Sequence, residues 1–281
     1  MKNTKWVTIV IFTLFCLPFS HISAQDILIA IEDYQFPPRY FYNEEGIVQG
    51  IEIDLMTEVT TRLNITPVYV KCPWKRCLIM MEYGEVDVMP YLLKRPDREK
   101  YMHYVEPPYQ KNSSKCFFVT KGYADSIKTY DDLHHIVVGV QKSAAYFAPF
   151  DQDSKIKKME VVEEKSMFPM LIRKRFDTFI GSCLPLSYIA QTMGYTDLVE
   201  KARYKYTSPN PAYIAVSKKS AYAKRLSEFN HALQEIVNSG AVENFKNNYL
   251  KPNNSHLLPP PRHHVRHSID QERTENQTTS H

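Results

Sequence analysis

Residues 84–109 read GEVDVMPYLLKRPDREKYMHYVEPPY, and we start from this stretch because it indicates the fold. It begins with the pattern of a short buried strand, in which Val86 and Val88 are two positions apart, and a proline and a charged turn at 94–98 follow. Ligands of open α/β sheets bind outside the carboxyl ends of the strands. Arg98 is therefore a candidate for binding an anion, although a surface turn in which Arg98 pairs with a neighbouring acid has the same pattern.

The composition of the whole chain is that of a globular protein with one large or two modest domains. The chain has 281 residues, of which 43% are hydrophobic, so it can bury a sizeable core. Apolar residues recur every four positions over 51–63, which predicts an amphipathic helix. The formal net charge of +4 is too weak to argue for nucleic acid or a membrane surface as a partner, and we expect neither.

The first 24 residues are typical of a secretory signal peptide. Two lysines precede an apolar run from 6 to 19, and Ile-Ser-Ala at 22–24 has the form of a cleavage site. The apolar run is short for a membrane span. We expect cleavage after Ala24 and release into the periplasm, and the alternative is an uncleaved N-terminal anchor.

Four cysteines follow the predicted signal peptide, and an exported protein can form disulfides. Cys72 and Cys77 flank Pro-Trp-Lys-Arg and are close enough in sequence to bridge. A Cys-x4-Cys pair can also bind metal, but no second ligand pair at a recognisable spacing accompanies it, so we expect no metal and no cofactor. Cys116 and Cys183 fit a bridge and two buried thiols equally well.

Five separate segments resemble the periplasmic solute-binding proteins of family 3, which serve amino-acid ABC transporters. Within 84–109, Gly-x-x-Asp-Val, Arg-Pro-Asp-Arg-x-Lys-Tyr and Val-Glu-Pro-Pro-Tyr resemble the G-x-x-D, T-P-E-R and F-S-x-P-Y core of that family. The loop at 32–38 resembles D-x-x-Y-P-P-F, and 50–55 resembles the helix start G-F-D-V-D-L. In the second half, 128–142 resembles I-K-T-x-x-D-L followed by V-G-V-Q-x-G, and 176–181 resembles R-x-D-A-V-V-A.

The resemblance implies a type II periplasmic-binding-protein fold, which is an α/β fold of two lobes, each a sheet flanked by helices, joined by a hinge. Residues 25–110 would form the first part of lobe 1 and 111–207 would form lobe 2. Residues 208–250 would return to lobe 1 with a strand at 209–216 and two closing helices. Residues 251–281 are rich in Pro, Asn, His and Thr without periodicity, and we expect them to be disordered.

The resemblance also places Arg98 on the position of the arginine that binds the ligand carboxylate. Aromatic residues beside the prolines of the first loop either stack on a ligand or cover the sheet edge, and Trp74 either lines the cleft or packs at a helix start. Two serines of the second half are possible helpers. The predicted ligand-binding residues are Arg98, Glu32, Tyr34, Phe36, Trp74, Tyr91, Ser143 and Ser182, and we predict no catalytic residue.

The chain departs from the family's amino-acid signature at several ligand positions. The small hydroxyl residues upstream of the arginine are replaced by Pro90, Tyr91 and Leu93, and the acid that usually binds the α-ammonium group is replaced by Ser182. A buried ammonium group without a carboxylate partner costs several kcal/mol. We therefore expect a carboxylated or otherwise anionic ligand with an apolar or aromatic body, unless Glu32 binds the ammonium group from the other lobe.

These features predict a monomeric receptor that closes on one small molecule for an ABC permease in the inner membrane. Two alternatives are a ligand-sensing role beside a separate membrane partner and an enzyme of the same fold that is similar to cyclohexadienyl dehydratase. The sequence contains no Ser-His-Asp order, no G-x-S-x-G and no phosphate-binding loop, which favours a binding protein over an enzyme.

Overall fold

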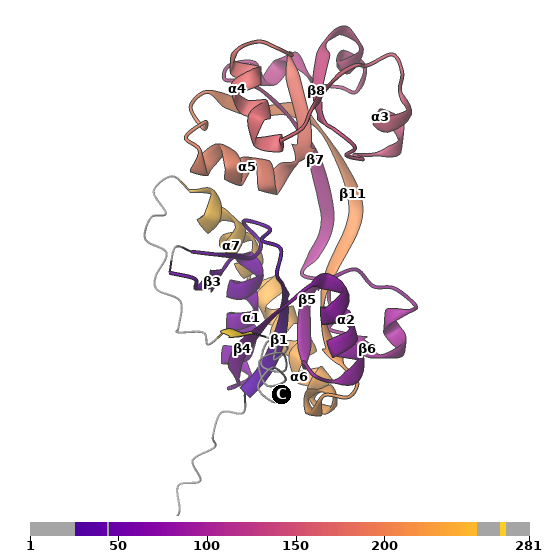
Figure 1. Cartoon of the computed structure of the whole chain (residues 1–281), viewed down its shortest axis with the longest axis vertical. Coiled ribbons are helices and arrows are strands. Elements are labelled where there is room, and N and C mark those ends of the chain that lie inside the picture. The colour runs from indigo at the N-terminus through magenta and orange to yellow at the C-terminus, as the bar shows by residue number, and fades with distance from the viewer. Residues whose placement is uncertain (1–25, 44, 252–264, 268–281) are drawn as a thin grey trace, which may run out of the picture.

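The structure, a computed structural model, describes residues 26–43, 45–251 and 265–267 (Figure 1). The predicted signal peptide at 1–24 lies outside these residues and stays a prediction. Within the described ranges, no helix has the length and apolarity that a bilayer crossing requires.

The first sheet is mostly parallel and has the strand order β12-β4-β1-β5-β11, in which β12 is the short strand Val265–His267. β1 (Asp26–Glu32) lies between β4 (Thr66–Cys72) and β5 (Val88–Leu92) and is parallel to both. β11 (Val199–Ser217) is antiparallel to β5, and β6 (Met102–Tyr104) also pairs with β11. The parallel strands end at one edge of the sheet, where a ligand site is expected.

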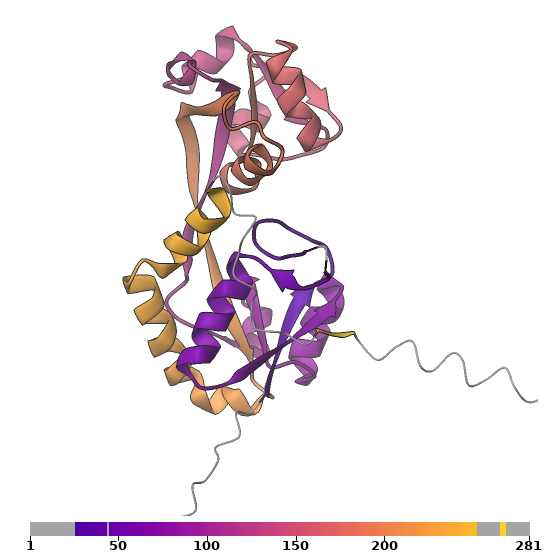
Figure 2. The ribbon, with the colours of Figure 1, turned by 90° about the vertical axis from the view of Figure 1, so that its left-hand side faces the viewer.

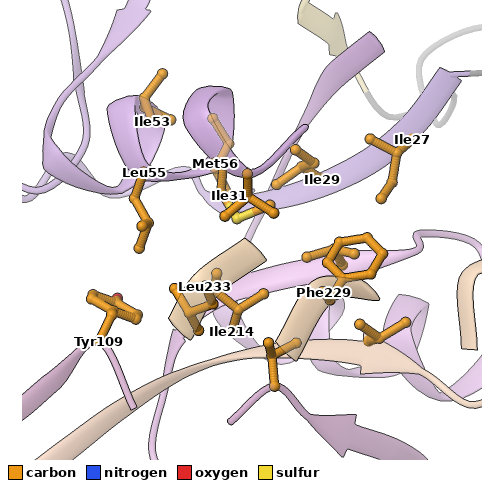
Figure 3. Packing of buried hydrophobic residues seen from close by; sticks show 14 of the residues in the cluster. Ile27, Ile29, Ile31, Ile53, Leu55, Met56, Tyr109, Ile214, Phe229 and Leu233 are labelled. Carbon is orange, nitrogen blue, oxygen red and sulfur yellow. The ribbon is translucent and has the colours of Figure 1, made fainter. Parts of the chain in front are cut away.

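Helices cover both faces of this sheet. Alternate residues of β1 point to opposite faces, and both sets are apolar and need to be buried. One face packs on α1 and α6, as Figure 3 shows for Ile27, Ile29 and Ile31 among the side chains of these helices. The other face, which includes Ala30, packs on Cys77 and Met81 of α2. The helices are α1 (Ile51–Arg62), α2 (Trp74–Tyr83), α6 (Leu226–Asn238) and α7 (Ala241–Leu250), and a small hairpin joins β2 (Phe41–Tyr42) to β3 (Val48–Gln49). The predicted helix at 51–63 is confirmed by α1.

The second sheet continues from β11 in the order β11-β7-β10-β8-β9. Its strands are β7 (Gln110–Thr120), β8 (Val137–Gln141), β9 (Lys157–Val161) and β10 (Thr178–Ser182). Its helices are α3 (Ala148–Gln152), α4 (Met167–Ile172) and α5 (Cys183–Thr192). Short 3-10 turns complete the described elements: η1 (Arg98–Lys100), η2 (Ala124–Ser126), η3 (Asp131–His135), η4 (Glu164–Ser166) and η5 (Ala221–Arg225).

Two long antiparallel strands connect the two halves of the chain (Figure 1). β7 and β11 pair from Gln110 with Ala212 to Thr120 with Val199, so β11 belongs to the second sheet at its start and to the first at its end. The chain is thus an α/β protein with two lobes, as expected. Figure 2 shows α7 reaching from the first lobe toward α5 of the second. The residue limits assigned to each lobe stay a prediction.

Both pairs of cysteines form disulfides. Cys72 bridges Cys77 with an S–S distance of 2.06 Å, as the sequence favoured, and the pair therefore binds no metal. Cys116 of β7 bridges Cys183 at the start of α5 with an S–S distance of 2.00 Å, which decides between the bridge and the two free thiols. Among the described residues, no group of three or more His, Cys, Asp or Glu side chains is arranged to hold a metal ion.

The C-terminal segment differs in part from the expected disorder of 251–281. The structure places β12 (Val265–His267) parallel to β4, with Val265 opposite Tyr69. The edge of β4 has unpaired backbone groups to which a further strand can bind. The polar composition of the C-terminal segment does not indicate this pairing. The structure thus has a short strand at 265–267, while 252–264 and 268–281 lie outside the described residues, and the disordered tail stays a prediction.

Candidate ligand-binding site

A cavity of about 510 Å³ lies at the carboxyl ends of the parallel strands of the first lobe. Glu32 ends β1, Trp74 follows the end of β4, and Tyr91 lies near the end of β5. The cavity therefore brings together six of the eight predicted ligand residues. Its lining consists of Glu32, Tyr34, Phe36, Tyr40, Trp74, Tyr91, Leu93, Arg95, Arg98 and Asn210.

Arg98 lines this cavity with an unpaired guanidinium group. Only 8% of the residue is exposed, and no carboxylate of the described residues lies within 4 Å of its charged nitrogens. The neighbouring acids bind other cations, since Asp97 pairs with Arg95 at 3.2 Å and Glu99 pairs with Lys94 at 3.6 Å. The structure therefore lacks the local surface pair that was the alternative explanation for Arg98.

Two contacts hold the side chain of Arg98 in place. Its Nη1 donates a hydrogen bond to the carbonyl oxygen of Leu93 at 3.3 Å, and its guanidinium carbon lies 5.2 Å from the centre of the Trp74 ring. A guanidinium over an indole face is a cation–π contact, which stabilises the charge without neutralising it. Trp74 is itself positioned within the loop that the Cys72–Cys77 disulfide closes.

Glu32 provides the negative charge of the same cavity. Its Oε2 accepts a hydrogen bond from Tyr40 Oη at 2.9 Å. Burial, together with this bond, raises the pKa of Tyr40 well above its ordinary value, so Tyr40 stays a neutral donor. The half-buried Glu32 carboxylate is thus held where a ligand ammonium group in the cavity could bind it.

Tyr91 enters the cavity through an irregularity in the sheet. Its φ of 60° lies in the left-handed region, which is uncommon for a bulky side chain, and the register between β5 and β11 shifts here, between Tyr213 and Ala215. Strain of this kind costs roughly 1–3 kcal/mol. This cost is offset in part by a cation–π contact, in which the guanidinium carbon of Arg39 lies 3.8 Å from the centre of the Tyr91 ring.

Arg39 is the centre of a buried network that the sequence did not reveal. Its Nη1 donates to Glu52 Oε1 at 2.7 Å and its Nη2 donates to Gln110 Oε1 at 2.7 Å. Gln110 Nε2 in turn donates to the carbonyl oxygen of Asn210 at 3.2 Å. Because Gln110 begins β7 and Asn210 belongs to β11, this network joins the first-lobe loop to both connecting strands.

A second cavity of about 260 Å³ lies between the lobes. It shares Phe36, Tyr91 and Asn210 with the first cavity, so the two form adjoining parts of one cleft. On its second-lobe side, Lys115 Nζ donates a hydrogen bond to Ser182 Oγ at 3.0 Å. Ser182 was predicted at the site, whereas Lys115 was not.

The sequence profile of the bacterial extracellular solute-binding proteins, family 3, matches residues 27–252. The chain belongs to this family. A related protein is the L-cystine-binding protein TcyJ of Escherichia coli strain K12, which is 25% identical over 120 residues. That match covers 43% of this chain and 44% of TcyJ, so the chain spans less than half of this relative.

Solved structures of other solute-binding proteins share the fold. The second substrate-binding domain of a putative amino acid ABC transporter from Streptococcus pneumoniae has a TM-score of 0.66 and 19% identity, over 80% of this chain and 100% of that domain. The L-cystine solute receptor of Neisseria gonorrhoeae, in its unliganded open conformation, also has a TM-score of 0.66, with 14% identity over 81% of this chain and 93% of the receptor. Both support the two-lobed architecture.

In this family 3 protein, the two predicted serines occupy different settings. Ser182 precedes α5 and lines the cavity between the lobes, whereas Ser143 lies in an exposed turn after β8 and lines neither of the two cavities. The φ of Ser143 is 63°, a conformation that glycine adopts most easily, and Ser143 stands on the glycine of the V-G-V-Q-x-G motif. Its role toward a ligand stays a prediction that requires the lobes to approach each other.

The cleft combines a buried cation, several aromatic faces and one acidic side chain. Arg98 offers a planar pair of donors to a carboxylate, and Trp74, Phe36 and Tyr91 offer aromatic faces. Glu32 adds one acceptor for a cationic group. This combination of an apolar lining with a few placed polar groups is typical of small-molecule binding sites.

Proposed function

We propose that this chain is a monomeric periplasmic receptor whose two lobes close on one small carboxylated metabolite, amino-acid-like in character. The observation that carries the proposal is the buried and unpaired guanidinium of Arg98 in the first-lobe cavity. A desolvated bidentate pair between arginine and a carboxylate is worth far more than an exposed ion pair. A carboxylate ligand would therefore supply the partner that the described residues do not.

L-Cystine and other amino acids are the first ligands to test, because the relative TcyJ is named for binding L-cystine. The ammonium group of such a ligand would be bound by Glu32, whose carboxylate faces the same cavity as Arg98. The aromatic faces of Phe36, Trp74 and Tyr91 would pack on its apolar part.

We also propose that this chain delivers its ligand to an ABC permease in the inner membrane, and its membership of a family that serves such transporters supports this. Export by cleavage after Ala24 would bring it to that partner. Mass spectrometry of the exported protein checks the export: an N-terminus at Gln25 supports a released receptor, and one at Met1 contradicts release.

The decisive experiment identifies the ligand and then removes Arg98. Mass spectrometry of small molecules released from the purified protein, together with a thermal-shift screen of amino acids and carboxylates, gives the ligand for calorimetry. We expect Arg98→Ala to weaken its binding by roughly 2–5 kcal/mol, because one partner of a buried charge pair is lost. Arg98→Lys should also weaken binding, since lysine lacks the planar pair of donors.

Arg95→Ala is the matched control for this experiment. Arg95 lines the same cavity, but its side chain is 59% exposed and already pairs with Asp97, so its loss should change affinity by less than about 1 kcal/mol. Equal effects of Arg95→Ala and Arg98→Ala would contradict the role given to Arg98. Turnover of prephenate or arogenate by the purified protein would instead favour an enzyme of this fold.

A further inference from the structure

The cavity between the lobes has an unusual charge composition for a protein that binds amino acids. Its lining includes three cationic side chains and no aspartate or glutamate. The three cations are Arg39, Lys115 and Lys246. An ammonium group entering this part of the cleft would meet like charge and no acceptor carboxylate.

Two of the three cations are already paired. Arg39 binds Glu52 at 2.7 Å, and Lys246 binds Glu243 at 3.0 Å. Lys115, by contrast, has no carboxylate of the described residues within 4 Å. It is the cation of this cavity that remains available to a ligand.

Lys115 is held in a defined position on the second lobe. It projects from β7, which pairs with β10 through Lys115 and Ser182, and its Nζ donates to Ser182 Oγ at 3.0 Å. An ammonium group has three donors, so one hydrogen bond leaves two for a ligand. Burial lowers the pKa of Lys115, while Glu164 and Asp151, which act on it from beyond ion-pair distance, oppose that effect.

We propose that Lys115 and Ser182 form an anion-binding subsite on the second lobe, so that the ligand carries two carboxylate groups, one for Arg98 and one for Lys115. This inference rests on the proposed function, because it assigns the second half of the same cleft. The two cavities share Phe36, Tyr91 and Asn210, so they adjoin, and a ligand that extends from one into the other would meet both cations. Closure of the lobes on such a ligand would place a negative charge beside each of them and strengthen both interactions as water leaves.

The chemistry of Ser182 explains why a second carboxylate is favoured over an ammonium group. The family's acid for the ammonium group would stand at this position, where the serine hydroxyl here accepts a hydrogen bond from a lysine. With Lys115 and Ser182 at this place, the second-lobe side of the cleft carries positive charge. A ligand ammonium group is thereby directed toward Glu32 in the first lobe.

Matched pairs of ligands test the subsite directly. The probes are the straight-chain dicarboxylates succinate, glutarate, adipate, pimelate and suberate, each compared with its half-amide, which has nearly the same shape and one charge fewer. Calorimetry uses the purified full chain with both disulfides formed. For at least one chain length we expect the dicarboxylate to bind about tenfold or more tightly than its half-amide.

Variants of Lys115 then assign this preference to the second lobe. Lys115→Met should reduce the preference for the dicarboxylate to about twofold or less, and Lys115→Arg should retain most of it. Lys205→Met is the matched control, because Lys205 lies in β11 opposite Cys116, is exposed and lines neither of the two cavities. The control should leave the preference unchanged.

Three outcomes would overturn the subsite. A preference that persists in Lys115→Met, or one that Lys205→Met also removes, shows that Lys115 does not bind the second carboxylate of the ligand. Binding of half-amides and dicarboxylates with equal affinity, and with a strong loss in Arg98→Ala, leaves the proposed receptor in place and refutes the second subsite alone. If no dicarboxylate binds while other carboxylates do, the ligand class inferred here is wrong; if no carboxylate of any kind binds, the proposed function fails with it.

Discussion

Replacement of Arg39 by leucine provides the sharpest test of how burial sets the energy of charge pairs in this protein. Arg39 is 6% exposed and Glu52 is fully buried, and one Glu52 oxygen accepts hydrogen bonds from Arg39 Nη1 at 2.7 Å and Tyr109 Oη at 3.2 Å. The second oxygen, Oε2, has no hydrogen-bond partner among the described residues. Without Arg39, the Glu52 carboxylate would be a buried charge with one neutral donor.

We expect Arg39→Leu to lower the free energy of unfolding by roughly 3–5 kcal/mol, the typical cost of removing one partner from a buried ion pair. Arg62 is the matched control, because it pairs with two carboxylates, Glu58 and Glu235, each at 2.8 Å, but its side chain is 33% exposed. Arg62→Leu should cost less than about 1 kcal/mol despite the larger number of pairs. Urea unfolding followed by circular dichroism measures both values.

The double variant Arg39→Leu/Glu52→Leu distinguishes the stabilisation by the ion pair from the cost of burying an unpaired carboxylate. Removing both charges together should recover much of the loss, because an unpaired buried carboxylate no longer remains. If Arg39→Leu does not fold, the double variant and Tyr109→Phe, which should cost about 1 kcal/mol, still measure the network. A larger loss in Arg62→Leu than in Arg39→Leu, or a double variant no more stable than Arg39→Leu alone, would refute this reasoning.

The fold was predictable where local patterns and long-range pairing agree. The four-residue spacing over 51–63 gives α1, because one face of that helix lies on the sheet. The strand expected at 209–216 is instead the end of β11 (Val199–Ser217), whose earlier residues carry a polar sequence. Those residues become a strand because β7 supplies their hydrogen bonds, and Pro209 lies where the register with β7 shifts, so the missing N–H is tolerated.

The candidate site was predictable to the extent that it depends on strand ends. Glu32, Trp74 and Tyr91 lie at or near the ends of three different parallel strands, and the sheet brings those ends together. Lys115 was missed because the sequence that ends at it, KNSSK at 111–115, is polar and contains no motif that indicates a site. Only the pairing of β7 with β10 places Lys115 beside Ser182, and the same pairing explains why the Cys116–Cys183 bridge, 67 residues apart, was left undecided.

The two disulfides and one half-buried acid give the remaining predictions. By the loss of chain entropy in the unfolded state, the Cys116–Cys183 disulfide should stabilise the fold by about 4 kcal/mol and the Cys72–Cys77 disulfide by about 2 kcal/mol. Replacing Cys116 and Cys183 by serine should therefore lower the urea midpoint more than replacing Cys72 and Cys77. The reverse order would contradict this estimate. Burial raises the pKa of Asp54 from 3.8 to about 6, so the folded state binds more protons than the unfolded state between these values. The contribution of Asp54 to the free energy of unfolding therefore falls as the pH rises through this window, by at most about 3 kcal/mol, and stays low at pH 7. Asp54→Asn cannot ionise, so it should be more stable than the native protein at pH 7 and should lose this advantage toward pH 4. Unfolding curves at several pH values measure this difference, and a gap that does not narrow between pH 6 and pH 4 would show that Asp54 titrates alike in both states.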